Sequence, residues 1–183
     1  TLFYVQVVSS QEDNQLYVTA VAWSNDGSKV AAVGIKPPGT EGYLRVVDTQ
    51  TGSILYELNP SPGGFTSVAW SPDDRFIAAG GYDQVIWVID VQSGTFVTSL
   101  QGHQSTVTAV DWNVDGTQLV SSGNWDGLTI LWDMTTYKQS RVVESRNLFP
   151  THVAFSPDSQ RIAVGGEGGI RIYTSNSSTD QNP

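Results

Sequence analysis

A short turn sequence recurs four times along the chain, and this recurrence constrains the fold more than any other feature. The copies read VAWSNDG, VAWSPDD, VDWNVDG and VAFSPDS. Their aromatic residues lie 47, 42 and 43 residues apart, at Trp23, Trp70, Trp112 and Phe155. A second landmark, the end of an apolar run, recurs after 42, 43 and 41 residues, at Asp48, Asp90, Asp133 and Thr174. Two landmarks that share a period of about 40–45 residues predict a structural repeat of four strands.

The most complete repeat shows how each unit is expected to fold. Residues 102–133 read GHQSTVTAVDWNVDGTQLVSSGNWDGLTILWD. Three β-prone runs are separated by the turn sequences NVDGT and NWDG, which predicts an antiparallel meander. An outer strand is expected near residues 140–145. We place the repeats at about 17–59, 63–101, 102–145 and 146–175, where the last has no fourth strand of its own, and read 176–183 as a polar tail.

The unit that opens with Gly102-His103 and closes with Trp132-Asp133 resembles a WD repeat of the WD40 type. The resemblance covers roughly residues 2–175. It implies an all-β fold, a β-propeller of four-stranded antiparallel WD-repeat blades, with four blades in this chain. It also implies that the strand expected at residues 2–8 supplies the missing outer strand of the last blade.

Four repeats leave the closure of the ring open, because the family usually has seven blades and sometimes eight. The chain could be half of an eight-bladed ring made by two copies, a fragment of a seven- or eight-bladed propeller, or a ring of four blades. The first residue is Thr1, which indicates a trimmed chain. We favour the two-copy ring, because an isolated half-ring would expose blade faces rich in Val, Ile and Trp.

The resemblance implies a hydrogen-bonded chain inside the third repeat. Its members by position are His103, Ser122, Asp126 and Trp132. An imidazole can donate to a carboxylate and accept from a hydroxyl, and the indole N–H completes the set. Serine, histidine and aspartate are also the residue types of a hydrolase, but in this family the set is structural. The other repeats have replaced it and are expected to depend on apolar packing.

Composition excludes several classes of function. The chain has no cysteine and two histidines, so we expect no metal site and no cofactor. The net charge of −9, from 18 acidic and 9 basic residues, disfavours nucleic acid and anionic membranes as partners. No apolar run approaches the ~18 residues of a membrane span. We expect a cytoplasmic protein, and the low lysine content together with the absence of cysteine indicates a bacterial source.

The resemblance further implies that partners bind the narrow face, around the mouth of the propeller channel. Three positions per repeat are expected there, and Trp125 is of most interest because a large aromatic residue in a tight turn has little core to join. Aromatic residues are favoured as interface anchors. Alternatively, the threonines line the channel as strand formers and the aromatic residues cap the core. The candidate face comprises Tyr17, Thr19, Thr66, Tyr82, Thr106, Thr108, Trp125, Phe149 and Thr151.

From these observations we predict a non-catalytic scaffold that binds a protein or peptide on the narrow face. One alternative is a self-assembling structural module, a homodimer whose main contact is with its own copy. Another is an enzyme or small-molecule binder that uses the central channel, for which the sequence supplies no catalytic residues. Fold resemblance alone does not decide among them.

Overall fold

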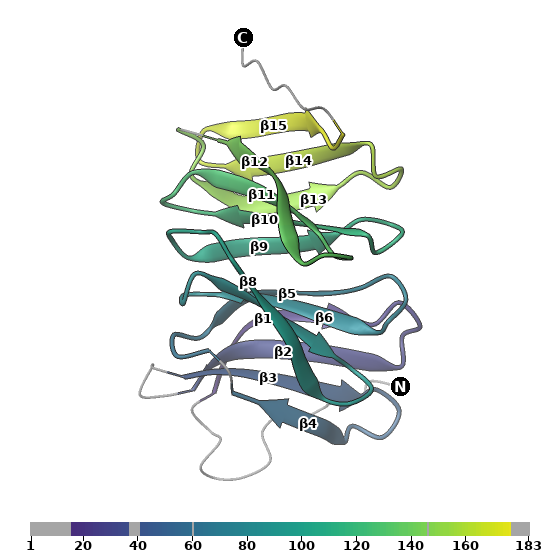
Figure 1. Cartoon of the computed structure of the whole chain (residues 1–183). Helices are drawn as coiled ribbons and strands as arrows, with labels where there is room; N and C mark the ends of the chain where they lie inside the picture. The colour runs from purple at the N-terminus through teal and green to yellow at the C-terminus, as the bar shows by residue number, and fades with distance from the viewer. Residues whose placement is uncertain (1–15, 37–40, 60, 146, 177–183) are drawn as a thin grey trace.

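The computed structural model describes residues 16–36, 41–59, 61–145 and 147–176, which form antiparallel β-sheets joined by turns (Figure 1). Helices are absent from these segments. The strands form four sheets, which we call blades 1 to 4 in chain order. Blade 1 contains β1 (Tyr17–Trp23), β2 (Lys29–Lys36), β3 (Glu41–Asp48) and β4 (Ile54–Leu58).

The other blades repeat the same meander. Blade 2 contains β5 (Phe65–Trp70), β6 (Phe76–Gly81), β7 (Val85–Asp90) and β8 (Thr95–Gln101). Blade 3 contains β9 (Val107–Trp112), β10 (Gln118–Gly123), β11 (Leu128–Asp133) and β12 (Lys138–Glu144). Blade 4 contains β13 (Pro150–Phe155), β14 (Arg161–Gly166) and β15 (Gly169–Thr174). The predicted all-β architecture of four-stranded blades is confirmed, whereas the strand expected at residues 2–8 and residues 177–183 of the tail lie outside the described segments.

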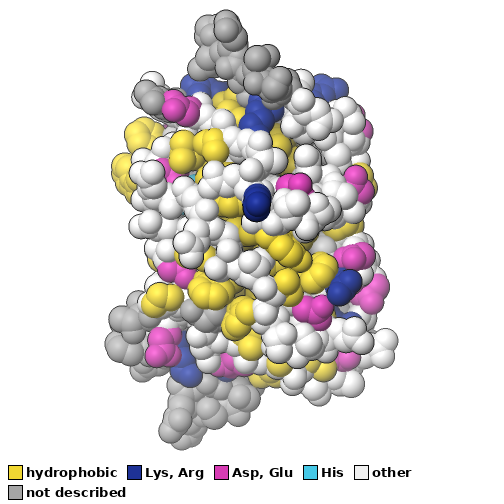
Figure 2. All heavy atoms as spheres, viewed as in Figure 1, with side chains coloured by type: hydrophobic (Ala, Val, Ile, Leu, Met, Phe, Trp, Pro, Cys, Tyr) yellow, Lys and Arg dark blue, Asp and Glu magenta, His cyan; other side chains and the backbone are white. Residues whose placement is uncertain are grey.

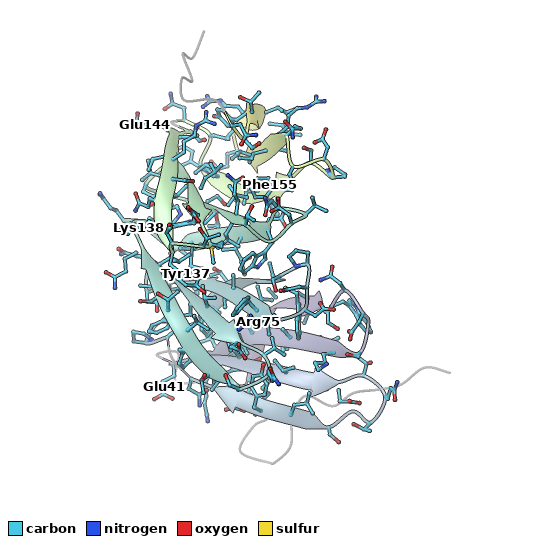
Figure 3. The ribbon with its side chains drawn as sticks, turned by 45° about the vertical axis from the view of Figure 1, so that its right-hand side comes forward. Glu41, Arg75, Tyr137, Lys138, Glu144 and Phe155 are labelled. Atoms are coloured by element: carbon cyan, nitrogen blue, oxygen red, sulfur yellow. The ribbon has the colours of Figure 1, made fainter. Side chains whose placement is uncertain are left out.

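The blades stack side by side, with blade 1 at one end of the molecule and blade 4 at the other (Figure 1). The outer strand β12 runs along the edge of blade 3 from Lys138 to Glu144, and Phe155 lies among the strands of the upper half (Figure 3). Antiparallel pairing brings the start of each first strand and the turn after each second strand to the same end of the blade, as in the pair Phe65 and Gly81. We call this end the narrow face.

Apolar clusters fill the space between neighbouring blades. Between blades 2 and 3, the first strand of the later blade contributes Val107, Val110 and Trp112, which pack against Ala78 and Val88. Corresponding clusters join blades 1 and 2 and blades 3 and 4. Because side chains alternate along a strand, an interior blade buries apolar residues on both faces. Each large side chain buried in this way contributes about 1.5–3 kcal/mol, so packing between blades stabilises the stack.

Aspartates at the ends of third strands hold the following turns. Asp48 Oδ1 accepts hydrogen bonds from the backbone N–H groups of Gln50 and Thr51 at 2.9 and 2.8 Å. In blade 2, Asp90 Oδ1 accepts from Gln92 and Ser93 at 3.0 Å each. The hydrogen bond from the Thr51 backbone is the main cause that lowers the pKa of Asp48 below its ordinary value. The aspartates are therefore turn residues.

Candidate functional site

A buried chain of polar side chains joins the strands of blade 3. His103 Nδ1 lies 2.9 Å from Asp126 Oδ2, and His103 Nε2 lies 2.8 Å from Ser121 Oγ. Trp132 Nε1 donates to the same Ser121 Oγ at 2.9 Å. One set of donors satisfies every member: the indole donates to the serine, the serine hydroxyl donates to Nε2, and Nδ1–H donates to the carboxylate.

The serine of this chain is Ser121, so the sequence prediction of Ser122 is wrong. Successive side chains of a strand point to opposite sheet faces, and an error of one residue moves the hydroxyl to the other face. Ser121 faces His103, whereas Ser122 Oγ lies 3.1 Å from the hydroxyl of Thr108 on the opposite side. Two neighbouring serines in VSSG cannot be separated by residue type, and the pairing register decides between them.

Asp126 gathers three hydrogen bonds at the end of this chain. Besides His103, the backbone N–H groups of Gln104 and Leu128 donate to its carboxylate at 2.9 Å each. Burial acts to raise the pKa of Asp126, but the hydrogen bonds, led by that from His103, outweigh it and hold the pKa below its ordinary value. A Cβ atom built on Gly123 would overlap both carboxylate oxygens and His103 Nδ1, so only glycine leaves room for the pair.

The Ser121, His103 and Asp126 contacts match the order of a hydrolase triad, but the environment does not suit one. Ser121 has no exposed surface, and its oxygen already accepts the Trp132 indole N–H. A nucleophile must reach its substrate, and this hydroxyl is enclosed by the blade. The chain therefore ties the strands of blade 3 together.

The recurring threonines of the candidate face have a structural role that the sequence did not reveal. Each is skipped in the pairing of first and second strands, so each is the extra residue of a β-bulge; the bulged residues are Thr19, Thr66, Thr108 and Thr151. A bulge re-aims its side chain. Thr19 Oγ1 donates to Phe65 O of blade 2 at 2.7 Å, and Thr66 Oγ1 likewise donates to Val107 O of blade 3. Three of the four thus link their blade to the next, since Thr108 Oγ1 donates to Pro150 O at 2.9 Å.

Two aromatic residues of the candidate face contact each other at the narrow face. The rings of Trp125 and Phe149 lie 5.5 Å apart at an interplanar angle of 69°, an edge-to-face arrangement. Trp125 is 76% exposed and Phe149 is 37% exposed. Trp125 belongs to the β10–β11 turn and Phe149 precedes β13, so the pair bridges blades 3 and 4. Hydrophobic side chains are visible along this edge of the upper blades (Figure 2).

The backbone before β13 is strained where it presents Phe149. Asn147 and Phe149 have φ angles of 64° and 44°, a conformation that a bulky aromatic residue rarely adopts. Leu148 between them is fully buried, and its carbonyl accepts the N–H of Gly168 at 3.4 Å. Burying Leu148 thus turns the Phe149 ring outward toward Trp125. Strain of this kind concentrates at functional sites.

The remaining candidates lie on blades 1 and 2 and just before β9 of blade 3. Tyr17 and Tyr82 are exposed on blades 1 and 2, and neither has a ring partner among the described residues. Thr106 is half-buried, and its carbonyl accepts the N–H of Asn124 at 3.3 Å. The structure therefore brings Trp125 and Phe149 together, while Tyr17 and Tyr82 stand apart.

Comparison with known proteins identifies the family of this chain. The family model described as "WD domain, G-beta repeat" matches residues 52–90, 94–133 and 142–174, together more than half of the chain. The chain belongs to the WD40 family. A chain in "Crystal Structure of Mitotic Checkpoint Complex" is similar, with a TM-score of 0.79 and 26% sequence identity. The match covers 88% of this WD40 chain and 49% of that chain, so this chain spans about half its length.

The WD40 sequence repeats are offset from the blades. The match over residues 52–90 begins before β4 and ends with β7, so it joins the outer strand of blade 1 to three strands of blade 2. WD40 propellers typically serve as platforms for protein–protein interaction rather than as enzymes. In the described segments, no helix has the length and apolar character needed to cross a bilayer. The same segments bring no three His, Asp or Glu side chains together as a metal-binding group.

Sequence reasoning missed how the other WD40 blades replace the polar chain. In blade 2, Trp87 Nε1 donates to Asp83 Oδ2 at 2.9 Å, so the turn aspartate binds an indole where Asp126 of blade 3 binds His103. In blade 4, the Tyr173 hydroxyl lies 3.2 Å from Ser145 Oγ of the preceding segment. The sequence signal for the first was the spacing of Asp83 and Trp87 across a tight turn. No sequence signal marks the second, because it spans two blades.

Proposed function

We propose that this WD40 chain is a non-catalytic scaffold that binds a protein or peptide at its narrow face. The observation that carries the proposal is the exposed, edge-to-face pair of Trp125 and Phe149. Rigid aromatic side chains lose little conformational entropy on binding and are enriched among interface anchors.

The surroundings of the pair support an apolar contact. Ser105 Oγ accepts the Trp125 N–H at 3.3 Å, and the Trp125 indole projects from the turn. Phe149 is held by a strained backbone between the buried Leu148 and β13. Two rings held against each other in this way form a small preorganised platform. With a net charge of −9 on the chain, the partner segment best suited to it offers an apolar side chain flanked by neutral or basic residues.

The test is selection of peptides from a random library on the intact chain, followed by measurement of their affinity for variants. We expect Trp125→Ala to raise the dissociation constant at least about 10-fold, since interface aromatic residues often contribute more than 1 kcal/mol. Val114→Ala is the matched control, because Val114 is 65% exposed in a turn at the opposite end of blade 3. The affinity of the Val114→Ala variant for the selected peptides should be unchanged. The urea midpoints of both variants should equal that of the parent.

Two outcomes would count against the narrow-face proposal. Selected peptides that bind the Trp125→Ala variant as tightly as the parent would show that the aromatic pair is not the contact. Cooperative unfolding of the Trp125→Ala variant under native conditions would instead show that Trp125 caps the core, which is the alternative that the sequence left open.

A further inference from the structure

The two end blades each leave one apolar sheet face without a neighbouring blade. On blade 1, Trp23 at the end of β1 is 64% exposed, and on blade 4, Ile170 and Ile172 of β15 are 77% and 65% exposed. Residues at the same repeat positions that face a neighbouring blade are buried, such as Trp70, Trp112, Leu44, Val46, Ile86 and Val88. Contiguous apolar exposure of this kind marks an interaction surface.

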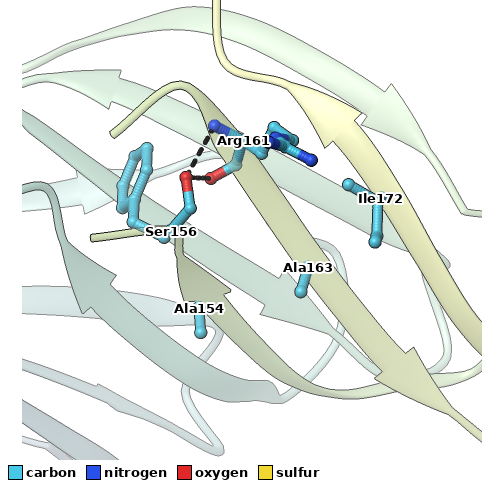
Figure 4. A pocket seen from close by; sticks show the side chains of 6 residues that line it. Ala154, Ser156, Arg161, Ala163 and Ile172 are labelled. Carbon is cyan, nitrogen blue, oxygen red and sulfur yellow. Dashed lines mark hydrogen bonds between the residues drawn. The ribbon is translucent and has the colours of Figure 1, made fainter. Parts of the chain in front are cut away.

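The open face of blade 4 is hollowed where a following blade would pack. Ala154, Ala163 and Ile172 line this hollow, with Arg161 and Ser156 at its rim (Figure 4). Ser156 Oγ accepts the backbone N–H of Arg161 at 2.9 Å, so the rim is ordered by its own turn. The hollow lies at the position where blades 1 and 2 receive Trp70 and Trp112 from the first strand of the next blade.

Within the chain, neighbouring blades are joined by a repeated hydrogen bond from this aromatic residue. Trp70 Nε1 donates to Ala22 O of the preceding blade at 2.9 Å, and Trp112 Nε1 donates to Ala69 O at 3.4 Å. Ala154 is the residue of blade 4 that corresponds to Ala22 and Ala69. By the same repeat, the indole N–H of Trp23 would donate to a carbonyl in the position of Ala154 O.

The bulged threonines define a second repeated bond. Thr19, Thr66 and Thr108 donate to the carbonyl of the residue five before the aromatic landmark in the next blade. Thr151 occupies the same bulge in blade 4, and its hydroxyl lies 3.3 Å from Gly165 O and 3.0 Å from His152 Nδ1 within its own blade. The corresponding acceptor in blade 1 is the carbonyl of Val18. Val18 as a residue is half exposed.

A buried glycine shows what the open face is shaped to receive. A Cβ atom on Gly80 of blade 2 would lie 2.5 Å from Val107 Cγ1, so glycine is required where the first strand of blade 3 packs. Gly165 holds the same position in blade 4, yet nothing lies within 4 Å of its Cβ position. Glycine inside a strand costs conformational entropy and signals close approach of another segment. The residue of blade 1 that corresponds to Val107 is Val18.

The turns between the first and second strands, at the end of each blade opposite the narrow face, also contact the next blade. Asn25 N donates to Asp74 Oδ1 of blade 2 at 2.6 Å, and Val114 N donates to Ser159 Oγ of blade 4 at 3.0 Å. Blade 2 has a proline at this position, without an N–H, and the residue facing Pro72 is Gly116, whose Cβ position lies 3.3 Å from the proline ring. Blade 4 also has a proline, Pro157, and blade 1 has the glycine, Gly27.

We infer that the open face of blade 4 binds blade 1 of a second copy of this chain, in the way that blade 2 binds blade 3. The positions given below match the buried junction of blades 2 and 3 except that Ile172 stands for Val88. Outside them, His152 stands for Ser67, whose Oγ accepts the Val110 N–H across that junction at 3.1 Å. On the blade 4 side the residues are Thr151, Ala154, Pro157, Ala163, Gly165, Ile170 and Ile172, for Thr66, Ala69, Pro72, Ala78, Gly80, Ile86 and Val88. On the blade 1 side they are Val18, Val21, Trp23 and Gly27, for Val107, Val110, Trp112 and Gly116.

A second copy fits better than closure of one chain on itself. Blades 1 and 4 lie at opposite ends of the stack, so β1 of one copy does not reach its own blade 4 (Figure 1). Two copies related by a two-fold axis make this head-to-tail junction twice and close a ring with four blades from each copy. Both apolar end faces are then covered at once.

The first test is the mass of the intact chain by light scattering across a wide range of concentrations. We expect a species of twice 19.8 kDa. Gly165→Leu should convert it to a monomer, because the added side chain has open space in one copy but would occupy the place of Val18 from the second. Trp23→Ala should raise the dissociation constant at least about 30-fold, as expected for a buried aromatic anchor.

Trp125→Ala is the matched control, since it removes an exposed tryptophan outside the junction and should leave the dimer intact. A mixture of the Gly165→Leu and Trp23→Ala variants provides a second readout. The unchanged β1 of the Gly165→Leu variant can bind the unchanged blade 4 face of the Trp23→Ala variant. At a concentration where each variant alone is monomeric, we expect the mixture to form a one-to-one heterodimer. A monomeric parent at all concentrations, a mass that grows without limit, or a dimer that survives Gly165→Leu would each overturn the inference.

Discussion

Replacing Ser121 with alanine should weaken the fold far more than the same change at Ser122. Ser121 Oγ bridges His103 Nε2 at 2.8 Å and Trp132 Nε1 at 2.9 Å. Trp132 is 1% exposed and His103 is 6% exposed, so neither side chain can replace the lost hydrogen bond with one to solvent water. Each buried polar group that loses its partner costs about 1–3 kcal/mol, so the loss of both contacts gives roughly 2–6 kcal/mol for Ser121→Ala.

Ser122 is the matched control because it is equally buried and adjacent in the chain. Its hydroxyl contacts Thr108 Oγ1 at 3.1 Å, and Thr108 keeps a backbone acceptor in Pro150 O at 2.9 Å. Loss of the Ser122 hydroxyl leaves no buried donor without an acceptor, so Ser122→Ala should lower the free energy of unfolding by about 0–1 kcal/mol.

The assay is urea unfolding of parent and variants, followed by tryptophan fluorescence and far-ultraviolet circular dichroism. We expect a clearly lower midpoint for Ser121→Ala and a nearly unchanged midpoint for Ser122→Ala. Equal shifts for the two variants, or a larger shift for Ser122→Ala, would refute the assignment of the polar chain to Ser121.

Three further predictions address packing and charge. Gly123→Ala should lower the free energy of unfolding by about 1–3 kcal/mol in thermal melts, because its Cβ would overlap the His103–Asp126 pair. Asp111→Asn should raise the unfolding free energy at pH 7, since burial raises the pKa of Asp111 and disfavours its charge, while an amide oxygen can still accept the Phe155 N–H now bonded at 2.7 Å. Acid should weaken the fold between about pH 4 and pH 2, because hydrogen bonds from Ser28 lower the pKa of Asp26 to about 2. The stabilisation is complete above the unfolded value of about 3.9 and is lost as the pH falls through the folded value, which urea midpoints measured against pH would show.

Regularly spaced features were predictable from residue type alone. The turn aspartates Asp48 and Asp90, the strand runs and the all-β class follow from local chemistry, because each depends on hydrogen bonds or packing within a few residues. The partners His103, Asp126 and Trp132 were named correctly because a single repeat contains all of them. The sequence did not show which residues join two blades.

The threonine positions show the limit most clearly. Their spacing was visible, but the sequence left open whether they contact a partner or line the channel as strand formers, whereas Thr19 and Thr108 donate to carbonyls of the next blade. That assignment needs the β-bulge, which depends on the register of two strands. The contact of Trp125 with Phe149 likewise depends on the left-handed backbone at Phe149.

The sequence by itself determined the period, the strands and the family, because a repeat imposes the same local conformation each time it occurs. Only the tertiary structure decided which of two adjacent serines faces His103 and which carbonyls the threonines bind. It also separated the exposed end faces at Trp23 and Ile170 from the identical residue types that interior blades bury. The physical reason is that strand register and blade order are properties of pairs of segments, and residue type reports only on one segment at a time.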